Sequence, residues 1–143
     1  MRVEENLASK IRVLCVDDHA LMREAITAVI RNEPDMILAA EACSGREAVE
    51  SFRLHQPDVT LMDLRLSGMS GIDAMLAIRT EFPEARIIIL TTFESDADMQ
   101  RAIESGALGY LLKSAPRGHL LQVIRQVHRE KKLTHPAGNR DHR

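Results

Sequence analysis

The sequence is poor in aromatic residues and in cysteine, and it has no long apolar run. Its 143 residues include no tryptophan, one tyrosine (Tyr110) and two cysteines (Cys15 and Cys43). Two cysteines without metal-ligand spacing argue against a disulfide framework and a zinc site. No apolar stretch approaches the roughly 20 residues of a membrane-spanning helix, and residues 1–6 lack the apolar segment of a signal peptide. We therefore expect a cytoplasmic protein without membrane contact, with both cysteines buried as free thiols.

The chain also lacks a large charge excess of either sign. Its formal net charge is −2, so the composition gives no general electrostatic case for binding nucleic acid. Residues 1–124 carry 13 basic and 19 acidic side chains, whereas residues 125–143 carry six basic and two acidic ones. The basic end can touch phosphates without specificity, but a solvated linker explains it better. We expect residues 1–10 to be a flexible amino terminus and residues 131–143 to be a linker or disordered tail.

Five short apolar runs alternate along the chain with five segments of helical periodicity. The runs predicted as strands are residues 11–16, 36–43, 59–63, 86–90 and 108–112. The segments predicted as helices are residues 19–32, 44–55, 71–82, 95–105 and 116–127. This alternation predicts one α/β domain over residues 11–130, a doubly wound parallel sheet with helices on both faces. The second predicted strand is less apolar, which favours a place at the edge of the sheet.

Local signals mark the ends and the inner faces of the predicted helices. Ser44 and Glu47 fit a capping box, and Gly106 fits a helix stop. Apolar residues at helical spacing predict the sides that pack on the sheet. Among these predicted inner residues are Leu21, Leu54, Leu76, Met99, Ile103, Leu120, Leu121, Ile124 and Val127.

Polar residues follow four of the five predicted strands at their carboxyl ends. Asp17 and Asp18 follow the first strand, Asp63 ends the third, Thr91 follows the fourth and Lys113 follows the fifth. Turn chemistry can explain any one of them but hardly the whole set. In open α/β sheets ligands bind outside the carboxyl ends of the strands. We therefore predict that these five residues form the functional site.

The residue types of this set favour a magnesium site that handles phosphate. If the first and third strands are neighbours, Asp63 lies roughly 5 Å from Asp17 and Asp18, and each like-charged pair repels by about 3 kcal/mol at an effective dielectric near 20. Three carboxylates then need a cation, and oxygen ligands favour Mg²⁺. A carboxylate held in this way is a nucleophile toward phosphorus. Lys113 and the Thr91 hydroxyl are placed to meet the phosphoryl oxygens.

These residues belong to four motifs with a clear family resemblance. The motifs are Val16-Asp17-Asp18-His19, Leu61-Met62-Asp63-Leu64, Leu90-Thr91-Thr92 and Gly109-Tyr110-Leu111-Leu112-Lys113. In this order they resemble the response-regulator receiver domain of bacterial two-component systems, over about residues 11–130. The first and last motifs are similar to the subfamily whose full-length members add a C-terminal LuxR-type helix-turn-helix for DNA binding. Only sixteen residues follow Val127, so we expect a piece of a transcription factor or a stand-alone receiver.

The resemblance implies a flavodoxin-like (receiver) fold with strand order 2-1-3-4-5 and five helices. It implies that Asp63 is the phosphoacceptor, which takes phosphate from the phosphohistidine of a sensor histidine kinase. Asp17, Asp18, Asp63 and the backbone carbonyl of Arg65 would surround Mg²⁺, with Asp17 bound directly or through water. The domain would be a signalling phosphoprotein of a phosphorelay rather than an enzyme, although such domains can catalyse their own phosphorylation and dephosphorylation.

The resemblance also assigns the switch residues. Thr91 would move toward the phosphate, Tyr110 would change rotamer with it, and Lys113 would pair with the phosphate. A half-buried aromatic side chain on a strand is compatible with the role of Tyr110.

Two positions depart from the family pattern. Ser67 stands where the family usually has proline in the loop after the phosphoacceptor, so we expect a looser loop in which Gly68 and Gly71 keep the turn. Ser114 follows Lys113, where many receivers have proline and often a cis bond. A cis bond before a residue other than proline costs about 2.5–4 kcal/mol, and we leave the 113–114 peptide open.

Three other functions compete with this interpretation. The first is a phosphatase of the haloacid-dehalogenase type, but these carry the nucleophile on the first strand in an Asp-x-Asp pattern, whereas Asp17 and Asp18 are adjacent here. The second is a flavin-binding module, which needs a hydroxyl-rich phosphate cradle in place of these acids. The third is a stand-alone receiver that acts as a phosphate sink.

The last predicted helix has a weakly polar outer face. This face carries the side chains His119, Gln122, Val123, Gln126 and His128. Such a face suits a transient dimer, and related receivers commonly dimerise through the first and last helices or through the fourth helix, fifth strand and fifth helix. We therefore expect phosphorylation of Asp63 to favour a symmetric homodimer through residues 117–128. DNA would be reached only through an effector domain that is missing from this chain.

Overall fold

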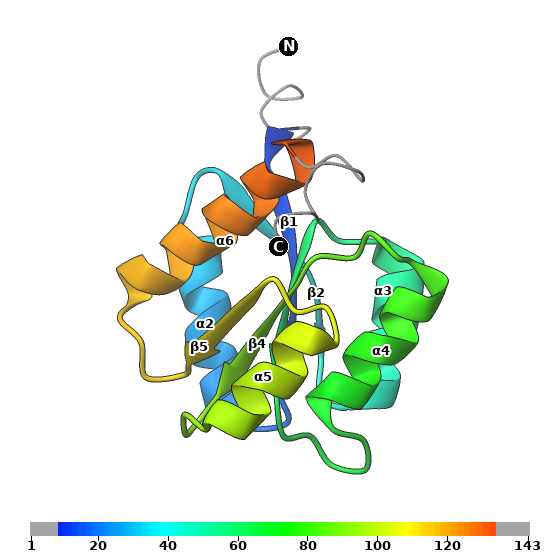
Figure 1. Cartoon of the computed structure of the whole chain (residues 1–143). Helices are drawn as coiled ribbons and strands as arrows, with labels where there is room; N and C mark the ends of the chain where they lie inside the picture. Colours follow the sequence, from blue (N-terminus) through cyan, green and yellow to red (C-terminus); the bar gives the residue numbers. More distant parts are fainter. Residues whose placement is uncertain (1–8, 134–143) are drawn as a thin grey trace.

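The computed structural model describes residues 9–133. The predictions for residues 1–8 and 134–143 lie outside the described part. The elements run in the order β1 (Ile11–Val16), α2 (Ala20–Arg31), β2 (Met36–Ala42), α3 (Gly45–His55), β3 (Val59–Asp63), α4 (Gly71–Glu81), β4 (Ile87–Thr91), α5 (Asp96–Glu104), β5 (Gly109–Leu112) and α6 (Arg117–Leu133) (Figure 1). Among the described helices, none has the length and apolar character needed to cross a bilayer.

The five strands form one parallel sheet in the order β2-β1-β3-β4-β5. The predicted fold class and strand order are therefore confirmed, and β2 lies at an edge as its composition suggested. The register pairs Val16 with Met62, Asp63 with Leu90 and Thr91 with Leu112. Since all strands point the same way, the residues that end β1, β3, β4 and β5 gather at one edge of the sheet.

Helices cover both faces of the sheet and create two apolar cores. On one face α2 and α6 pack together, and on the other face lie α3, α4 and α5 (Figure 1). Successive residues of the inner strands alternate between these cores: Leu61 and Ile88 face the first, whereas Met62 and Ile89 face the second. A strand that is buried on both faces has no solvent side, which explains why the inner strands are apolar throughout.

Serine side chains start three of the helices. Ser44, Ser70 and Ser95 each occupy the N-cap and accept a hydrogen bond from the backbone N–H three residues later. The predicted capping box at Ser44 is present in a shifted form, because the Glu47 carboxylate accepts from the backbone N–H of Cys43 at 2.9 Å rather than from that of Ser44. Gly106, with a φ of +110°, follows α5 as predicted.

Several predictions of burial are wrong. Leu21 and Leu54 are 82% and 77% exposed, and Leu76, Met99 and Ile103 are also exposed. Helical spacing overestimated the number of helix residues that face the sheet, because a helix touches the sheet along a narrow stripe. In α5, for example, only Ala102 is buried. Cys43 is exposed, since β2 stops at Ala42 and Cys43 begins the loop. Cys15 is buried as predicted, and burial raises the pKa of its thiol to about 12.

The last helix is held to the sheet by apolar and ionic contacts. Its predicted stripe of Leu120, Leu121, Ile124 and Val127 is buried in the core shared with α2. The Arg125 guanidinium lies 2.7 Å from Glu33 and 2.8 Å from Asp35, which lie between α2 and β2. The helix continues to Leu133, beyond the predicted end of the domain at residue 130.

Gly71 lies where backbone segments approach most closely. Its N–H donates to the Leu64 carbonyl at 2.7 Å, and a Cβ at this position would collide with the Asp63 carbonyl oxygen. The first residue of α4 is therefore packed directly against the end of β3, the strand that carries Asp63.

We predict that Gly71→Ala destabilises the domain by about 1–3 kcal/mol, the usual cost of forcing extra atoms into a packed site. Gly118→Ala is the matched control, because a Cβ there meets no atom within 4 Å and the residue lies in α6. Alanine in a helix is favoured over glycine by up to about 1 kcal/mol, so the control should be neutral or stabilising. Urea denaturation followed by far-UV circular dichroism measures both. Equal stabilities of the two variants would contradict the close approach at Gly71.

Candidate functional site

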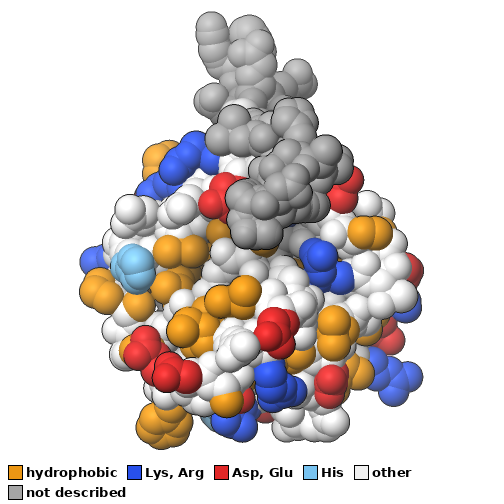
Figure 2. Space-filling view, viewed as in Figure 1, with side chains coloured by type: hydrophobic (Ala, Val, Ile, Leu, Met, Phe, Trp, Pro, Cys, Tyr) orange, Lys and Arg blue, Asp and Glu red, His pale blue; other side chains and the backbone are white. Residues whose placement is uncertain are grey.

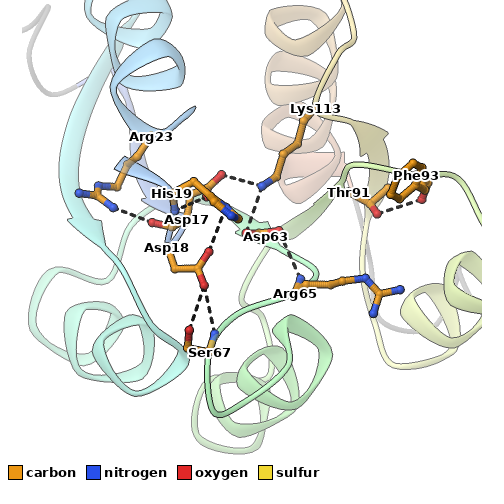
Figure 3. A network of polar contacts seen from close by, with 10 residues as sticks. All are labelled: Asp17, Asp18, His19, Arg23, Asp63, Arg65, Ser67, Thr91, Phe93 and Lys113. Carbon is orange, nitrogen blue, oxygen red and sulfur yellow. Dashed lines mark hydrogen bonds and ion pairs between the residues drawn. The ribbon is translucent and has the colours of Figure 1, made fainter. Parts of the chain in front are cut away.

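The site lies at the carboxyl edge of the sheet, and its residues come from four strands. Asp17 follows β1, Asp63 ends β3, Thr91 ends β4 and Lys113 follows β5. Asp17, Asp63 and Thr91 are buried, with exposed fractions of 0%, 3% and 3%. The structure brings Asp17, Asp63 and Lys113 into contact (Figure 3).

Each of the three carboxylates has one oxygen anchored by donors of the protein. Asp17 Oδ1 accepts from the backbone N–H of His19 at 2.9 Å, and Asp63 Oδ1 accepts from that of Arg65 at 3.3 Å. Asp18 Oδ2 accepts from both the backbone N–H and the hydroxyl of Ser67, each at 3.2 Å. These bonds fix the orientation of the three carboxylates (Figure 3).

The second oxygen of each carboxylate is buried and has no hydrogen-bond partner of good geometry among the described residues. Asp17 Oδ2 and Asp63 Oδ2 meet the Lys113 ammonium group at 3.0 and 3.1 Å, and Asp18 Oδ1 meets the imidazole of His19 at 3.1 Å. Buried carboxylate oxygens without hydrogen bonds are costly unless a cation approaches them. Lys113 therefore supplies positive charge to two of these oxygens, and none of the three is satisfied by hydrogen bonds of good geometry among the described residues.

The charges of the cluster do not cancel within the protein. Three ionised carboxylates and one ammonium group leave a charge of −2, which one divalent cation would neutralise. Ligand atoms of Asp17, Asp18, His19 and Asp63 all lie within 4.8 Å of one another, close enough to share an ion. Mg²⁺ prefers oxygen ligands and usually keeps several of its waters. A cluster that offers a few carboxylate oxygens therefore fits the predicted metal.

Burial and neighbouring charges shift the proton affinities of the site. Burial raises the pKa of Asp63; polar contact with Lys113 and the Lys113 charge lower it, and the Asp17 charge raises it again, so the net shift is upward. Burial alone would lower the pKa of Lys113, but its contacts with Asp17 and Asp63 outweigh burial and raise it. Lys113 therefore stays protonated and is the permanent cation of the site.

Thr91 and Tyr110, the two predicted switch residues, contact groups other than the three carboxylates. The Thr91 hydroxyl donates to the backbone carbonyl of Phe93 at 3.0 Å and points away from Asp63 (Figure 3). Tyr110 is half-buried, as expected, and its hydroxyl has no hydrogen-bond partner of good geometry among the described residues. Burial and the negative charge of Asp98 raise the pKa of this hydroxyl. In this structure, therefore, neither hydroxyl contacts the carboxylate cluster.

Arg65 connects the loop after Asp63 to α5. Its backbone N–H binds Asp63, whereas its side chain is exposed and points the other way, toward Asp98 at 3.3 Å (Figure 3). The Arg101 guanidinium lies 3.7 Å from the same Asp98 carboxylate. The assignment of the Arg65 carbonyl as a metal ligand stays a prediction.

Ser67 and Ser114 are the two departures from the family pattern. Ser67 was expected to loosen its loop, but its two donors tie the loop to Asp18. A proline at this position would supply neither donor. No peptide bond in the described chain is cis, so the 113–114 bond is trans.

Sequence reasoning missed the positions of Ser67 and His19 in the site. His19 was quoted only as part of the first motif, yet its Nδ1 lies 3.3 Å from Asp17 Oδ1 and 3.1 Å from Asp18 Oδ1. Its place directly after two aspartates was the available signal. For Ser67 there was none, because a contact over 49 residues of chain depends on the fold.

Comparisons with known proteins agree with the geometry. The family model of the response regulator receiver domain matches residues 13–125. The chain is 41% identical over 115 residues to the transcriptional regulatory protein LiaR of Bacillus subtilis, an alignment that covers 80% of this chain and 54% of LiaR. It is 36% identical over 121 residues to the nitrate/nitrite response regulator protein homolog of Haemophilus influenzae, with 85% and 58% covered. The chain therefore spans little more than half the length of these curated relatives.

Solved structures give the same result. The signal receiver domain of the response regulator NarL from Mycobacterium tuberculosis superposes with a TM-score of 0.81 at 30% identity, covering 85% of this chain and 98% of that one. A LuxR-family two-component response regulator from Aurantimonas also reaches 0.81, at 37% identity, with 85% and 86% covered. The resemblance inferred from the motifs is confirmed: the chain belongs to the response regulator receiver domain family, and its receiver domain is of the kind found in LuxR-family two-component response regulators.

Proposed function

We propose that Asp63 accepts a phosphoryl group from the phosphohistidine of a sensor histidine kinase and that this event switches the domain. The observation that carries the proposal is the cluster of Asp17, Asp18 and Asp63 with Lys113, in which each carboxylate keeps one buried oxygen without a hydrogen bond of good geometry. The competing phosphatase interpretation has no better support, because the acids after β1 are adjacent in the sequence. As a signalling domain with a kinase partner, the chain would act in the cytoplasm.

The residues of the site suit each part of the transfer. A carboxylate oxygen of Asp63 forms a bond to phosphorus while the bond from phosphorus to the kinase nitrogen breaks, and that nitrogen keeps the electron pair. Asp17, Asp18, Asp63 and the Arg65 carbonyl would hold Mg²⁺, which neutralises charge on the carboxylates and the phosphate when bound. Lys113 is free to leave the two carboxylates and pair with the phosphoryl oxygens. Thr91 would give up its bond to Phe93 and donate to the same group.

We predict that a small phosphodonor such as acetyl phosphate, with magnesium, adds one phosphoryl group to the chain and none to Asp63→Asn. Intact-mass spectrometry measures the addition. Asp73→Asn is the control, because Asp73 is an exposed residue of α4 and its variant should react like the parent. Phosphorylation of Asp63→Asn as readily as the parent would show that the acceptor is another residue.

The same variant should remain folded. A neutral amide at position 63 removes a buried charge whose pKa is raised, so without magnesium its Tm should equal or exceed that of the parent. A gain of about 1 kcal/mol would raise the Tm by roughly 2–8 °C in a domain of this size. Differential scanning calorimetry measures the Tm of both proteins. An Asp63→Asn variant that keeps its Tm but is not phosphorylated has lost the acceptor and not the fold.

We predict that Lys113→Ala and Thr91→Ala keep magnesium binding but lose the conformational response to phosphorylation. Both side chains would meet the phosphoryl oxygens, and removing the Lys113 cation cannot weaken attraction for another cation. Isothermal titration calorimetry measures magnesium affinity, and hydrogen exchange of residues 91–98 with and without beryllofluoride measures the response. Arg117→Ala and Thr92→Ala are matched controls, since both residues are exposed neighbours. A loss of magnesium affinity as severe as in Asp18→Ala would refute these roles.

The surface around α6 indicates where a partner would bind. The structure closes the apolar stripe of α6 against the sheet, so a partner would meet the outer face, where His119, Gln122 and Gln126 are exposed. Val123 is only partly accessible, because it packs beside Gly109 of β5. Next to this face, Met99, Ile103 and Leu108 are 39%, 56% and 41% exposed, and Figure 2 shows hydrophobic side chains gathered over α5 and β5. Exposed apolar side chains beside a weakly polar helix are typical of an interface.

We therefore propose a phosphorylation-dependent symmetric homodimer through residues 117–128, with α5 and β5 alongside. Sedimentation velocity with and without beryllofluoride and magnesium measures it. The double variant Gln122→Glu/Gln126→Glu should abolish the dimer, because it places like charges opposite each other across a symmetric interface. Ala77→Glu is the control, since this exposed position lies on α4, on the other face of the sheet. A monomer in both samples at high concentration would refute the dimer.

DNA binding belongs to the proposal only through another domain. The relative from Bacillus subtilis is described as a transcriptional regulatory protein, and this chain covers 54% of it. In a longer protein the dimer of receiver domains would bring two effector domains together on DNA. A receiver acting alone as a phosphate sink would use the same Asp63 chemistry without that step.

A further inference from the structure

One imidazole nitrogen, that of His19, lies among the oxygen atoms of the carboxylate cluster. His19 follows Asp18 directly, and its side chain is 71% exposed, yet Nδ1 turns inward to within 3.3 Å of Asp17 Oδ1 and 3.1 Å of Asp18 Oδ1 (Figure 3). An exposed histidine can orient its ring toward water. Here Nδ1 faces two carboxylates instead.

We propose that His19 Nδ1 is a ligand of the divalent-metal site and that it shifts the preference of this site toward ions that accept nitrogen, such as Mn²⁺ and the later transition metals. This inference rests on the proposed metal site of Asp17, Asp18 and Asp63. Imidazole nitrogen suits transition metals, whereas Mg²⁺ strongly prefers oxygen. The site therefore binds Mg²⁺ through oxygen alone and binds a transition metal with one additional ligand.

The contacts of His19 support a role as ligand. The atoms that Asp17, Asp18, His19 and Asp63 offer to a metal lie within 4.8 Å of one another. Asp18 Oδ1, which the imidazole approaches, is one of the three buried oxygens without a hydrogen bond of good geometry. A ligand nitrogen must be free of a proton, so the ring would bind as the tautomer with hydrogen on Nε2. Nε2–H would then face solvent and would need no partner in the protein.

The helix does not need this side chain. His19 occupies the N-cap of α2, but its side chain makes no capping hydrogen bond. Its imidazole contacts are with Asp17 and Asp18. Asparagine is among the preferred N-cap residues, so His19→Asn should keep α2 intact while removing the imidazole nitrogen.

Manganese is the probe for the test. Room-temperature electron paramagnetic resonance counts free and bound Mn²⁺, and electron spin echo envelope modulation detects ¹⁴N bound to the ion. We expect a directly coordinated ¹⁴N in the parent and none in His19→Asn. The control is His55→Gln, which should behave like the parent because His55 lies at the end of α3, near the opposite edge of the sheet. The affinity of His19→Asn for Mn²⁺ should be at least about tenfold lower than that of the parent. Tenfold is the smaller end of the loss in metal affinity seen when a residue that supports a metal ligand is removed. Its Mg²⁺ affinity, measured by calorimetry, should change much less.

Two results would overturn the inference while leaving the carboxylate site in place. In the first, the parent binds Mn²⁺ but its spectrum shows no ¹⁴N modulation. In the second, the ¹⁴N modulation persists in His19→Asn. A different failure would remove the metal site itself: no Mn²⁺ taken up by the parent, or equal uptake by Asp18→Asn. Circular dichroism of each variant confirms that α2 is retained.

Discussion

The Lys113 ammonium group lies between Asp17 and Asp63, and the proposed function depends on this contact. Among the residues that the structure describes, it is the cation within 3.1 Å of these two carboxylates, which are 0% and 3% exposed. Without it the buried charges would repel each other at a cost of several kcal/mol. With it, they still carry unbalanced negative charge and buried oxygens without a hydrogen bond of good geometry. The cluster is thus stable in the folded domain, and its unbalanced charge supports the proposal that it binds a cation and then a phosphoryl group.

The rest of the fold holds these groups in place. The sheet register brings the ends of β1, β3, β4 and β5 to one edge, and the two apolar cores hold the inner strands from both sides. Because such cores are close-packed, the strand ends have little freedom to drift. Gly71 lets α4 start directly against β3, and Ser67 ties the following loop back to Asp18. The carboxylates are therefore oriented before any ligand arrives.

The polar groups around the cluster have alternative partners, which is what a switch requires. The Thr91 hydroxyl is bound to the Phe93 carbonyl, and the Arg65 side chain is paired with Asp98. Burial and then the negative charge of Asp98 raise the pKa of Tyr110. These are exposed or local contacts, worth little individually, so in the proposed switch a doubly charged phosphate at Asp63 would compete for them. Their weakness would then couple the proposed chemistry at β3 to the surface formed by α5 and β5.

The sequence by itself determined the five strands, the five helices and the set of polar residues at the carboxyl edge, because the strands are mostly apolar and four of the five are followed by or end in a polar residue. Alternation along a chain predicts a parallel sheet, and motifs such as Val16-Asp17-Asp18-His19 identify the family. Only the tertiary structure decided which helix residues are exposed, that Cys43 lies in a loop, and that Ser67 and His19 reach Asp18. Periodicity describes one element at a time. Burial and contacts over long stretches of chain depend on how the elements pack together.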